Sequence, residues 1–123
     1  MNIGAVSTVM ELARNMTNLQ SIVDVSTAYC NCDISNIQEK IYPAPLEPRA
    51  VLDLCKVLDH SKLNEQAVTE AMISPKPNTY TFTKALAENI IETEGKDLPV
   101  AILRPSIVAA AWKDPVPGTS YLR

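Results

Sequence analysis

The chain has 123 residues, so it is at most one domain, and it is long enough to bury a hydrophobic core. Its formal net charge is −3 and 46% of its residues are hydrophobic, which excludes general disorder and argues against a nucleic-acid-binding surface. No apolar run reaches the length of a membrane span, and the N-terminus lacks the pattern of a signal peptide. We therefore expect this chain to be soluble and cytoplasmic, with no nucleic-acid partner and no membrane segment.

Three cysteines, an odd number, indicate reduced thiols rather than a disulfide framework. Cys30 and Cys32 are too close together for the usual zinc-binding pair, and only Cys55 and the single histidine, His60, remain as distant partners. We expect no metal site.

The first part of the chain predicts a helix followed by a strand. Apolar residues recur at a helical period over 2–16, and 21–26 is a short β-branched run typical of a strand. Ser26 and Thr27 lie at the carboxyl end of that strand, where open α/β sheets bind ligands, so their hydroxyls are candidate donors to a substrate oxygen. The alternative is that these residues form a strand-terminating turn.

The middle of the chain predicts a proline-containing loop and two helices. Residues 33–47 are irregular, and Pro48 suits a first helical position at the start of a helix over 48–59. Ser61 suits the N-cap of a second short helix that runs to about residue 73.

A longer helix and a second strand follow. Asn78 suits the N-cap of a helix over 79–94, and Gly95 suits its C-terminal stop. The apolar run 100–103 predicts a buried strand that stops at Arg104-Pro105. This alternation of helices and strands is typical of an α/β fold with a parallel sheet and helices on its faces.

Tyr80 and Lys84 are four residues apart, which places both side chains on one face of the predicted helix. A free tyrosine has a pKa of roughly 10, and a nearby cation favours the phenolate, so the pair suits general acid/base chemistry at a carbonyl or hydroxyl oxygen. The alternative is a solvated surface contact worth a few tenths of a kcal/mol.

Several blocks in order resemble the alcohol-forming fatty acyl-CoA reductases, especially those of insects, within the extended short-chain dehydrogenase/reductases. The blocks are Val25-Ser26-Thr27-Ala28-Tyr29-Cys30-Asn31, Glu39-Lys40-Ile41-Tyr42-Pro43, residues 77–88 and residues 98–108. The likeness covers about residues 2–117, with the helical insert of that family between the blocks.

The resemblance implies a role for each matching residue. Tyr80 would give a proton to the carbonyl oxygen, and Lys84 would lower the pKa of Tyr80 and hold the nicotinamide ribose. Thr27, with Ser26 as the alternative, would polarise the substrate oxygen, and Asn2 matches an asparagine that supports a proton relay to the lysine. The backbone that lines the nicotinamide would be that of Pro105, Ser106, Ile107 and Val108.

The same resemblance implies NADPH as the cofactor and a long-chain fatty acyl-CoA as the substrate. Reduction would pass through the aldehyde to the primary alcohol, in two hydride transfers. The resemblance also implies that the full-length proteins lie on the cytosolic side of the endoplasmic reticulum or the peroxisome membrane.

The sequence departs from the family in its glycines. Gly4, Gly95 and Gly118 are far apart, so they cannot form the Gly-rich phosphate-binding loop of a dinucleotide site. We therefore expect residues 1–118 to be the central to C-terminal part of a truncated NAD(P)-binding Rossmann domain that lacks its first βαβ units. Residues 119–123 are expected to be an unstructured tail.

Two further interpretations stay open. One is a truncated, non-catalytic product that binds a partner through an exposed sheet edge. The other is a different extended reductase, acting on a sugar nucleotide or a steroid, against which the long insert over 33–77 argues. For the isolated chain we expect no activity and marginal or molten packing, because strands from the middle of a sheet lack neighbours.

Overall fold

The computed structural model describes residues 2–63, 65–113 and 116–118, so the expected tail at 119–123 lies outside the described residues. The described part is an α/β structure with a two-stranded parallel sheet, β1 (Ile22–Val25) and β2 (Val100–Leu103), in which Ile22 lies opposite Val100. The helices are α1 (Asn2–Arg14), the 3₁₀ helix η1 (Ala28–Asn31), α2 (Pro48–Val57), α3 (His60–Leu63), α4 (Gln66–Ile73) and α5 (Thr79–Glu94). Of these described helices, none combines the length and the apolar character that a membrane crossing requires.

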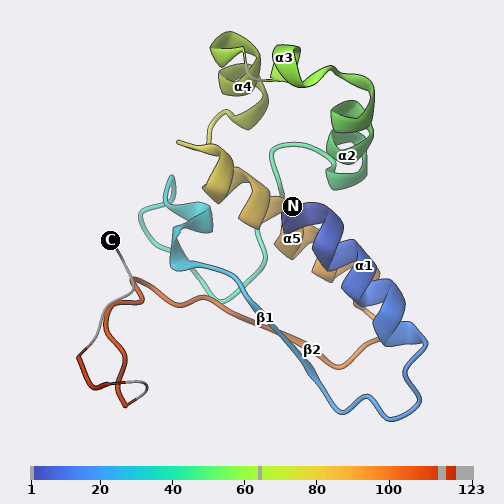
Figure 1. Cartoon of the computed structure of the whole chain (residues 1–123), viewed down its shortest axis with the longest axis vertical. Helices are drawn as coiled ribbons and strands as arrows, with labels where there is room; N and C mark the ends of the chain where they lie inside the picture. Colours follow the sequence, from blue (N-terminus) through green and yellow to red (C-terminus); the bar gives the residue numbers. More distant parts are fainter. Residues whose placement is uncertain (1, 64, 114–115, 119–123) are drawn as a thin grey trace.

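Helices α1 and α5 pack against each other and lie between the sheet and the group formed by α2, α3 and α4 (Figure 1). Residues 106–113 run away from the sheet, in orange to red in the same view. The sequence correctly predicts the order of both strands and of α1, α2 and α5, with the irregular loop over 33–47, but it does not predict η1. In this arrangement α5 is central, because it contacts α1, α2, α4 and η1.

Helix α5 begins and ends where the sequence predicts. The backbone of Asn78 is extended, and its Oδ1 accepts a hydrogen bond from the Thr81 amide at 2.9 Å, which satisfies one of the free donors of the first turn. Gly95 ends the helix, and a Cβ atom built there would lie 2.6 Å from the carbonyl oxygen of Ile91. A larger residue at position 95 would therefore collide with the backbone of the last turn.

Helix α2 begins where the sequence predicts, but the helical stretch that follows it differs from the prediction. Pro48 lies in the first turn of α2, as expected, and the Glu47 carboxylate caps that turn by accepting from the Ala50 amide at 2.6 Å. The prediction of one helix capped by Ser61 is wrong, since two short helices occupy this stretch. Ser61 lies within α3 because the carbonyl of Asp59 already accepts from the Lys62 and Leu63 amides.

The hydrophobic core lies where α5 meets α1 and α2. Leu86 is fully buried and Phe82 is 3% exposed. Burial of each large apolar side chain stabilises the fold by about 1.5–3 kcal/mol, so α5 is the main source of this stabilisation. The core cluster consists of Ile3, Val51, Phe82, Leu86 and Ile90.

The expectation that 100–103 is a buried strand is wrong for one of its two faces. Both strands alternate between partly buried and exposed residues, and Leu103 is 56% exposed. Ile102 lies on the half-buried side, whereas Val23 on β1 is 57% exposed. The reason is that α1 and α5 lie on one side of the sheet (Figure 1), and no described element covers the other face.

We expect the purified chain to bind the dye ANS at this uncovered face, because contiguous exposed apolar side chains are where such dyes bind. The changes Val23→Thr and Leu103→Thr should lower the dye fluorescence. Val57→Thr is the matched control, since Val57 is 83% exposed on α2, away from the sheet. A chain that binds no dye, or variants that bind as much as the original, would contradict this account of the sheet.

Candidate functional site

Three polar side chains lie one turn apart on α5, namely Tyr80, Lys84 and Glu88. Because a helix has about 3.6 residues per turn, they share one face. Their burial increases along the helix: Tyr80 is 51% exposed, Lys84 is partly buried and Glu88 is 1% exposed. This stripe therefore runs from the surface into the interior of the protein.

Lys84 is held at the end of β1. Its Nζ donates to the carbonyl oxygen of Val25 at 2.9 Å, across 59 residues of sequence. Val25 immediately precedes Ser26 and Thr27, so this bond brings the ammonium to the strand end that carries the two candidate hydroxyls. Lys84 is thus hydrogen-bonded to a second element, β1. The alternative interpretation, a solvated contact between Tyr80 and Lys84 on the helix surface, does not require such a bond.

Ser26 and Thr27 differ in what their hydroxyls already do. Both residues are 4% exposed, and the Ser26 hydroxyl donates to Oε1 of Glu88 at 2.6 Å. Thr27 has extended backbone and caps η1, where its Oγ1 accepts from the Tyr29 amide at 3.2 Å. At Thr27 the strand thus passes into the turn of η1, which was the alternative interpretation of these residues. A hydroxyl that accepts one hydrogen bond still has its own proton to donate, so Thr27 remains the freer donor.

Glu88 joins the ends of both strands to α5. Arg104, which follows β2, donates to it twice, from Nε at 2.8 Å and from Nη2 at 2.6 Å. Nη2 of Arg104 also donates to the Lys40 carbonyl at 2.9 Å, which fixes the loop over 33–47. A planar guanidinium and a carboxylate held in this fork-like manner form one of the strongest pairs available to side chains.

The environment of Glu88 determines its charge. Burial alone raises the pKa of this carboxyl, but the hydrogen bonds from Arg104, Ser26 and Cys30 outweigh that effect and hold the pKa below its ordinary value of 4.5. The Glu88 carboxylate is therefore charged at neutral pH and is compensated by Arg104.

Cys30 belongs to the same network as a neutral thiol. It is fully buried and its Sγ lies 3.3 Å from Oε1 of Glu88. Burial, together with the Glu88 charge, raises the pKa of the Cys30 thiol from 9.0 to about 11. The thiol therefore stays protonated and unreactive near neutral pH, which is typical of a structural cysteine.

Asp24 adds a carboxyl to the covered face of β1. Burial raises its pKa, the Lys84 ammonium opposes that rise, and the negative charge of Glu88 adds to it. The end of β1 thus presents several interacting charges to α5, a pattern that occurs often at functional sites and also in structural ion-pair networks.

Asn2 and the segment after β2 approach the site from two sides. The side-chain amide of Asn2 donates to Oγ1 of Thr83 at 3.1 Å, which brings the start of α1 next to the turn that carries Lys84. The Pro105 carbonyl accepts from the Ala28 amide at 2.9 Å, directly after Thr27. The rest of the predicted cofactor segment is exposed, at 72% for Ile107 and 72% for Val108, with Ser106 also exposed.

Glu88 is not among the site residues that the sequence predicts, and Arg104 is predicted only as the end of a strand. One signal was available for Glu88. It continues the four-residue spacing of Tyr80 and Lys84, and it is a carboxylate among apolar helix positions, which requires a buried partner. Arg104 offered no local signal, because its partner is 16 residues away on another element.

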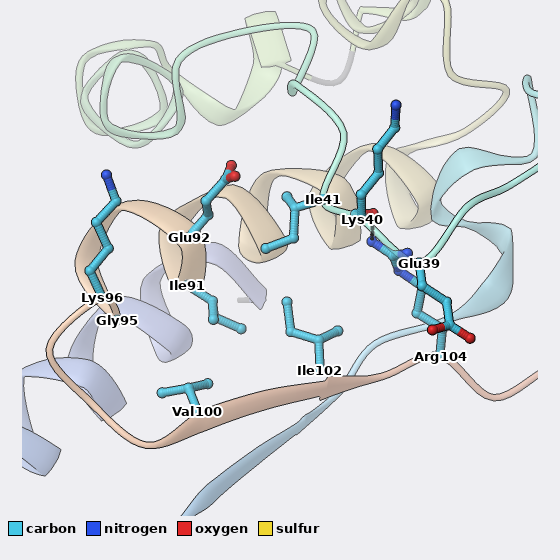
Figure 2. A pocket seen from close by; sticks show the side chains of 10 residues that line it. All are labelled: Glu39, Lys40, Ile41, Ile91, Glu92, Gly95, Lys96, Val100, Ile102 and Arg104. Atoms are coloured by element: carbon cyan, nitrogen blue, oxygen red, sulfur yellow. Dashed lines mark hydrogen bonds between the residues drawn. The ribbon is translucent and has the colours of Figure 1, made fainter.

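A cavity of about 640 Å³ lies beside β2 and does not coincide with the Tyr80 end of α5. Figure 2 shows Ile41 and Ile91 extending toward Val100 and Ile102, which give it apolar walls. Arg104 lies at one end, where it bonds to the backbone of Lys40 (Figure 2). The cavity therefore shares Arg104 with the network around Glu88, whereas Tyr80 and Lys84 are not among the residues that line it.

The described residues show no cluster of three or more His, Cys, Asp or Glu side chains that is suited to a metal ion. For an organic cofactor, the available groups at the strand ends are the half-exposed phenol of Tyr80 and the Lys84 ammonium. An ammonium has three donors, and the bond to Val25 uses one of them.

Comparisons with known proteins agree on one family. Residues 1–121 match a family model for NAD-binding proteins that is described as "Male sterility protein". Over 118 residues, the chain is 44% identical to fatty acyl-CoA reductase 1 of Gallus gallus and 44% identical to fatty acyl-CoA reductase 2 of Mus musculus. It is 41% identical to fatty acyl-CoA reductase 2 of Homo sapiens. Each match covers 96% of this chain, which spans only 22% of the length of these relatives.

We expect the ion pair between Glu88 and Arg104 to make the free energy of unfolding decrease at acid pH. The folded-state pKa of Glu88 is depressed, so its contribution is present above its ordinary value of 4.5 and is lost as the pH falls through the lower, folded-state pKa. Thermal unfolding followed by circular dichroism from neutral to acid pH should show this loss. In Glu88→Gln the acid-dependent part should be smaller and the stability at neutral pH lower, by about 3–5 kcal/mol at most, because Arg104 loses its charged partner.

The matched control for that experiment is Glu92→Gln, an exposed carboxylate one turn further along α5. It should keep the pH dependence of the original chain. Equal acid sensitivity in Glu88→Gln and the original chain would remove Glu88 from this role.

We expect the three cysteines to differ in their reaction with iodoacetamide. Cys32 and Cys55 are exposed and should be alkylated first. Cys30 should react about 100-fold more slowly, since a rise in pKa from 9.0 to about 11 lowers the thiolate fraction by that factor even before access is considered. Peptide mapping by mass spectrometry measures the three rates, and fast labelling of Cys30 in the native chain would contradict the buried network.

Proposed function

The chain belongs to the NAD-binding family described as male sterility protein, and from this premise we propose that it carries the proton-donating site of a fatty acyl-CoA reductase. The proposed reaction is the NADPH-dependent reduction of a long-chain fatty acyl-CoA, through the aldehyde, to the primary alcohol. The observation that carries the proposal is the hydrogen bond from Lys84 to Val25, which places the ammonium at the strand end, one helical turn from Tyr80.

In this proposal Tyr80 is the proton donor. Its phenol is half-exposed, so it is open to a substrate oxygen. The Lys84 ammonium lies on the same face of α5 one turn further along. Lys84 is itself held by Val25, so this charge is fixed in advance rather than recruited during the reaction.

Thr27 is the proposed donor that polarises the substrate oxygen, in preference to Ser26. The Ser26 hydroxyl donates its proton to Glu88 at 2.6 Å, so it has none left to give. The Thr27 oxygen accepts from the Tyr29 amide and keeps its own proton for the developing negative charge. Preorganised donors at that oxygen are the main means of lowering the barrier.

The nicotinamide cofactor supplies hydride when it is bound. Two free donors on Lys84 and the accessible phenol of Tyr80 suit the hydroxyls of the nicotinamide ribose. The segment that begins at Pro105 is anchored beside Thr27 and suits the nicotinamide ring. The residues of this chain do not provide a Gly-rich turn for the diphosphate, so they fit the nicotinamide end of the cofactor alone.

The balance of hydrides and protons fixes how many protons the site must supply. Reduction of a thioester to an alcohol consumes two hydrides and two protons and releases a thiol. Tyr80 is the proposed donor of a proton to the carbonyl oxygen, and the bond from Asn2 to Thr83 brings the start of α1 to the turn that carries Lys84.

The test is a chimera in which this chain replaces the matched 118-residue stretch of Gallus gallus fatty acyl-CoA reductase 1. We expect the chimera to oxidise NADPH in the presence of a long-chain acyl-CoA and to release a fatty alcohol, measured by gas chromatography. Tyr80→Phe should lower turnover by at least about 100-fold, the usual contribution of a general acid, with cofactor affinity largely kept.

Tyr42→Phe is the control for that variant. It removes a phenol whose oxygen accepts a hydrogen bond from the Gln38 amide in the loop over 33–47. Turnover should stay close to that of the unmodified chimera. If Tyr80→Phe also retained full turnover, Tyr80 would have no part in the mechanism.

A further inference from the structure

Lys76 is a buried cation in the short segment that leads into α5. Its side chain is 5% exposed, although lysine is almost never buried without a partner. Its Nζ donates to Oδ1 of Asp33 at 2.5 Å and to Oδ1 of Asn31 at 3.3 Å. These contacts span 43 and 45 residues of sequence, so Lys76 connects two segments that the chain itself does not hold together.

The two connected segments are the ones that carry the proposed donors. Asn31 ends η1, and the residue that caps the start of η1 is Thr27. Lys76 lies four residues before Tyr80, and its own amide donates to the Ile73 carbonyl at 2.8 Å. The contact between Lys76 and Asn31 therefore joins the Thr27 turn to the start of the helix that carries Tyr80.

The charges in this contact are matched. The hydrogen bond from Lys76 holds the pKa of Asp33 below its ordinary value, so the Asp33 carboxylate is charged at neutral pH. The side-chain amide of Asn31 donates in turn to Sγ of Cys30 at 3.2 Å. This bond links the contact between Lys76 and Asn31 to the network around Glu88. A buried charge that is paired and hydrogen-bonded in this way resists displacement, because separation would leave it uncompensated.

The start of α5 needs such an anchor. Asn78, Thr79 and Tyr80 are all exposed, and the first turn of a helix is the part that frays. Glu88 fixes α5 against the strands two turns further along, at the opposite end of the stripe. Between these two anchors lies the Lys84 contact with Val25.

We propose that Lys76 is a positioning residue, whose contacts with Asp33 and Asn31 set the distance between the Tyr80 phenol and the Thr27 hydroxyl. The role rests on the proposed function, since it matters for catalysis only if those two groups act on one substrate oxygen. Lys76 does not touch the substrate. It acts through Tyr80, because a displacement of about 1 Å at a reacting group is enough to lower a rate by roughly 100-fold.

The first experiment uses the full chain and needs no activity. Lys76→Met should raise the iodoacetamide labelling rate of Cys30 by at least about tenfold, because η1 loses its contact with the segment before α5. Lys76→Arg, which keeps the charge, should label more slowly than Lys76→Met. Lys56→Met is the control, since the exposed pair of Lys56 and Asp53 on α2 is remote from η1 in the fold. Unchanged labelling of Cys30 in Lys76→Met would overturn the anchor.

The second experiment measures kinetics in the chimera. Lys76→Met should lower kcat by roughly tenfold to 100-fold with little change in the KM for acyl-CoA. In the Tyr80→Phe background, the same change should cause no further loss, because the residue acts through Tyr80. A purely structural role would instead lower the residual rate by the same factor in both backgrounds, and that result would overturn the proposal.

The two proposals fail in different ways. An inactive chimera with the original residues would overturn the proposed function, and with it the positioning role, whatever the labelling rates. An active chimera that is unaffected by Lys76→Met would overturn the positioning role alone.

Discussion

The structure depends on the contact between Glu88 and Arg104. A carboxylate that is 1% exposed is stable only if its charge is compensated, and here a guanidinium and a hydroxyl from two different strand ends supply the compensation. Because the partners come from after β1 and after β2, this single side chain fixes the helix against both strands. Removing either charge would leave the other one buried, so the contact constrains the position of α5 along the sheet.

The same constraint sets the candidate site. Once Glu88 is fixed, the helical repeat places Lys84 one turn and Tyr80 two turns away on the same face. Lys84 then reaches the carbonyl of Val25, and the phenol lies at the surface where a substrate has access. Apolar residues on the other faces of α5, Phe82 and Leu86 among them, pack into the core, so one helix serves both packing and chemistry.

Much of this fold follows from local patterns in the sequence. Asn78 and Gly95 predict the two ends of α5, because helix capping and helix termination depend on neighbouring residues alone. The four-residue spacing likewise predicts that Tyr80 and Lys84 share a face. The network around Glu88 did not follow, because its hydrogen bonds join residues 16, 58 and 62 positions apart. Periodicity carries no information about such pairs, and the same applies to Lys76 and Asp33.

The exposure of the strands was misjudged for a related reason. An apolar run such as 100–103 predicts burial on both faces, but burial requires elements that cover both faces, and composition does not show which elements those are. The central claim, that the α5 stripe faces a nicotinamide at the strand ends, is tested most directly by a crystal structure of the chimera with bound NADPH. The account predicts that the Lys84 ammonium contacts both the Val25 carbonyl and the nicotinamide ribose, with the Tyr80 phenol and the Thr27 hydroxyl pointing to one open position. A structure in which NADPH lies elsewhere, or in which the Tyr80 ring points away from Thr27, would contradict it.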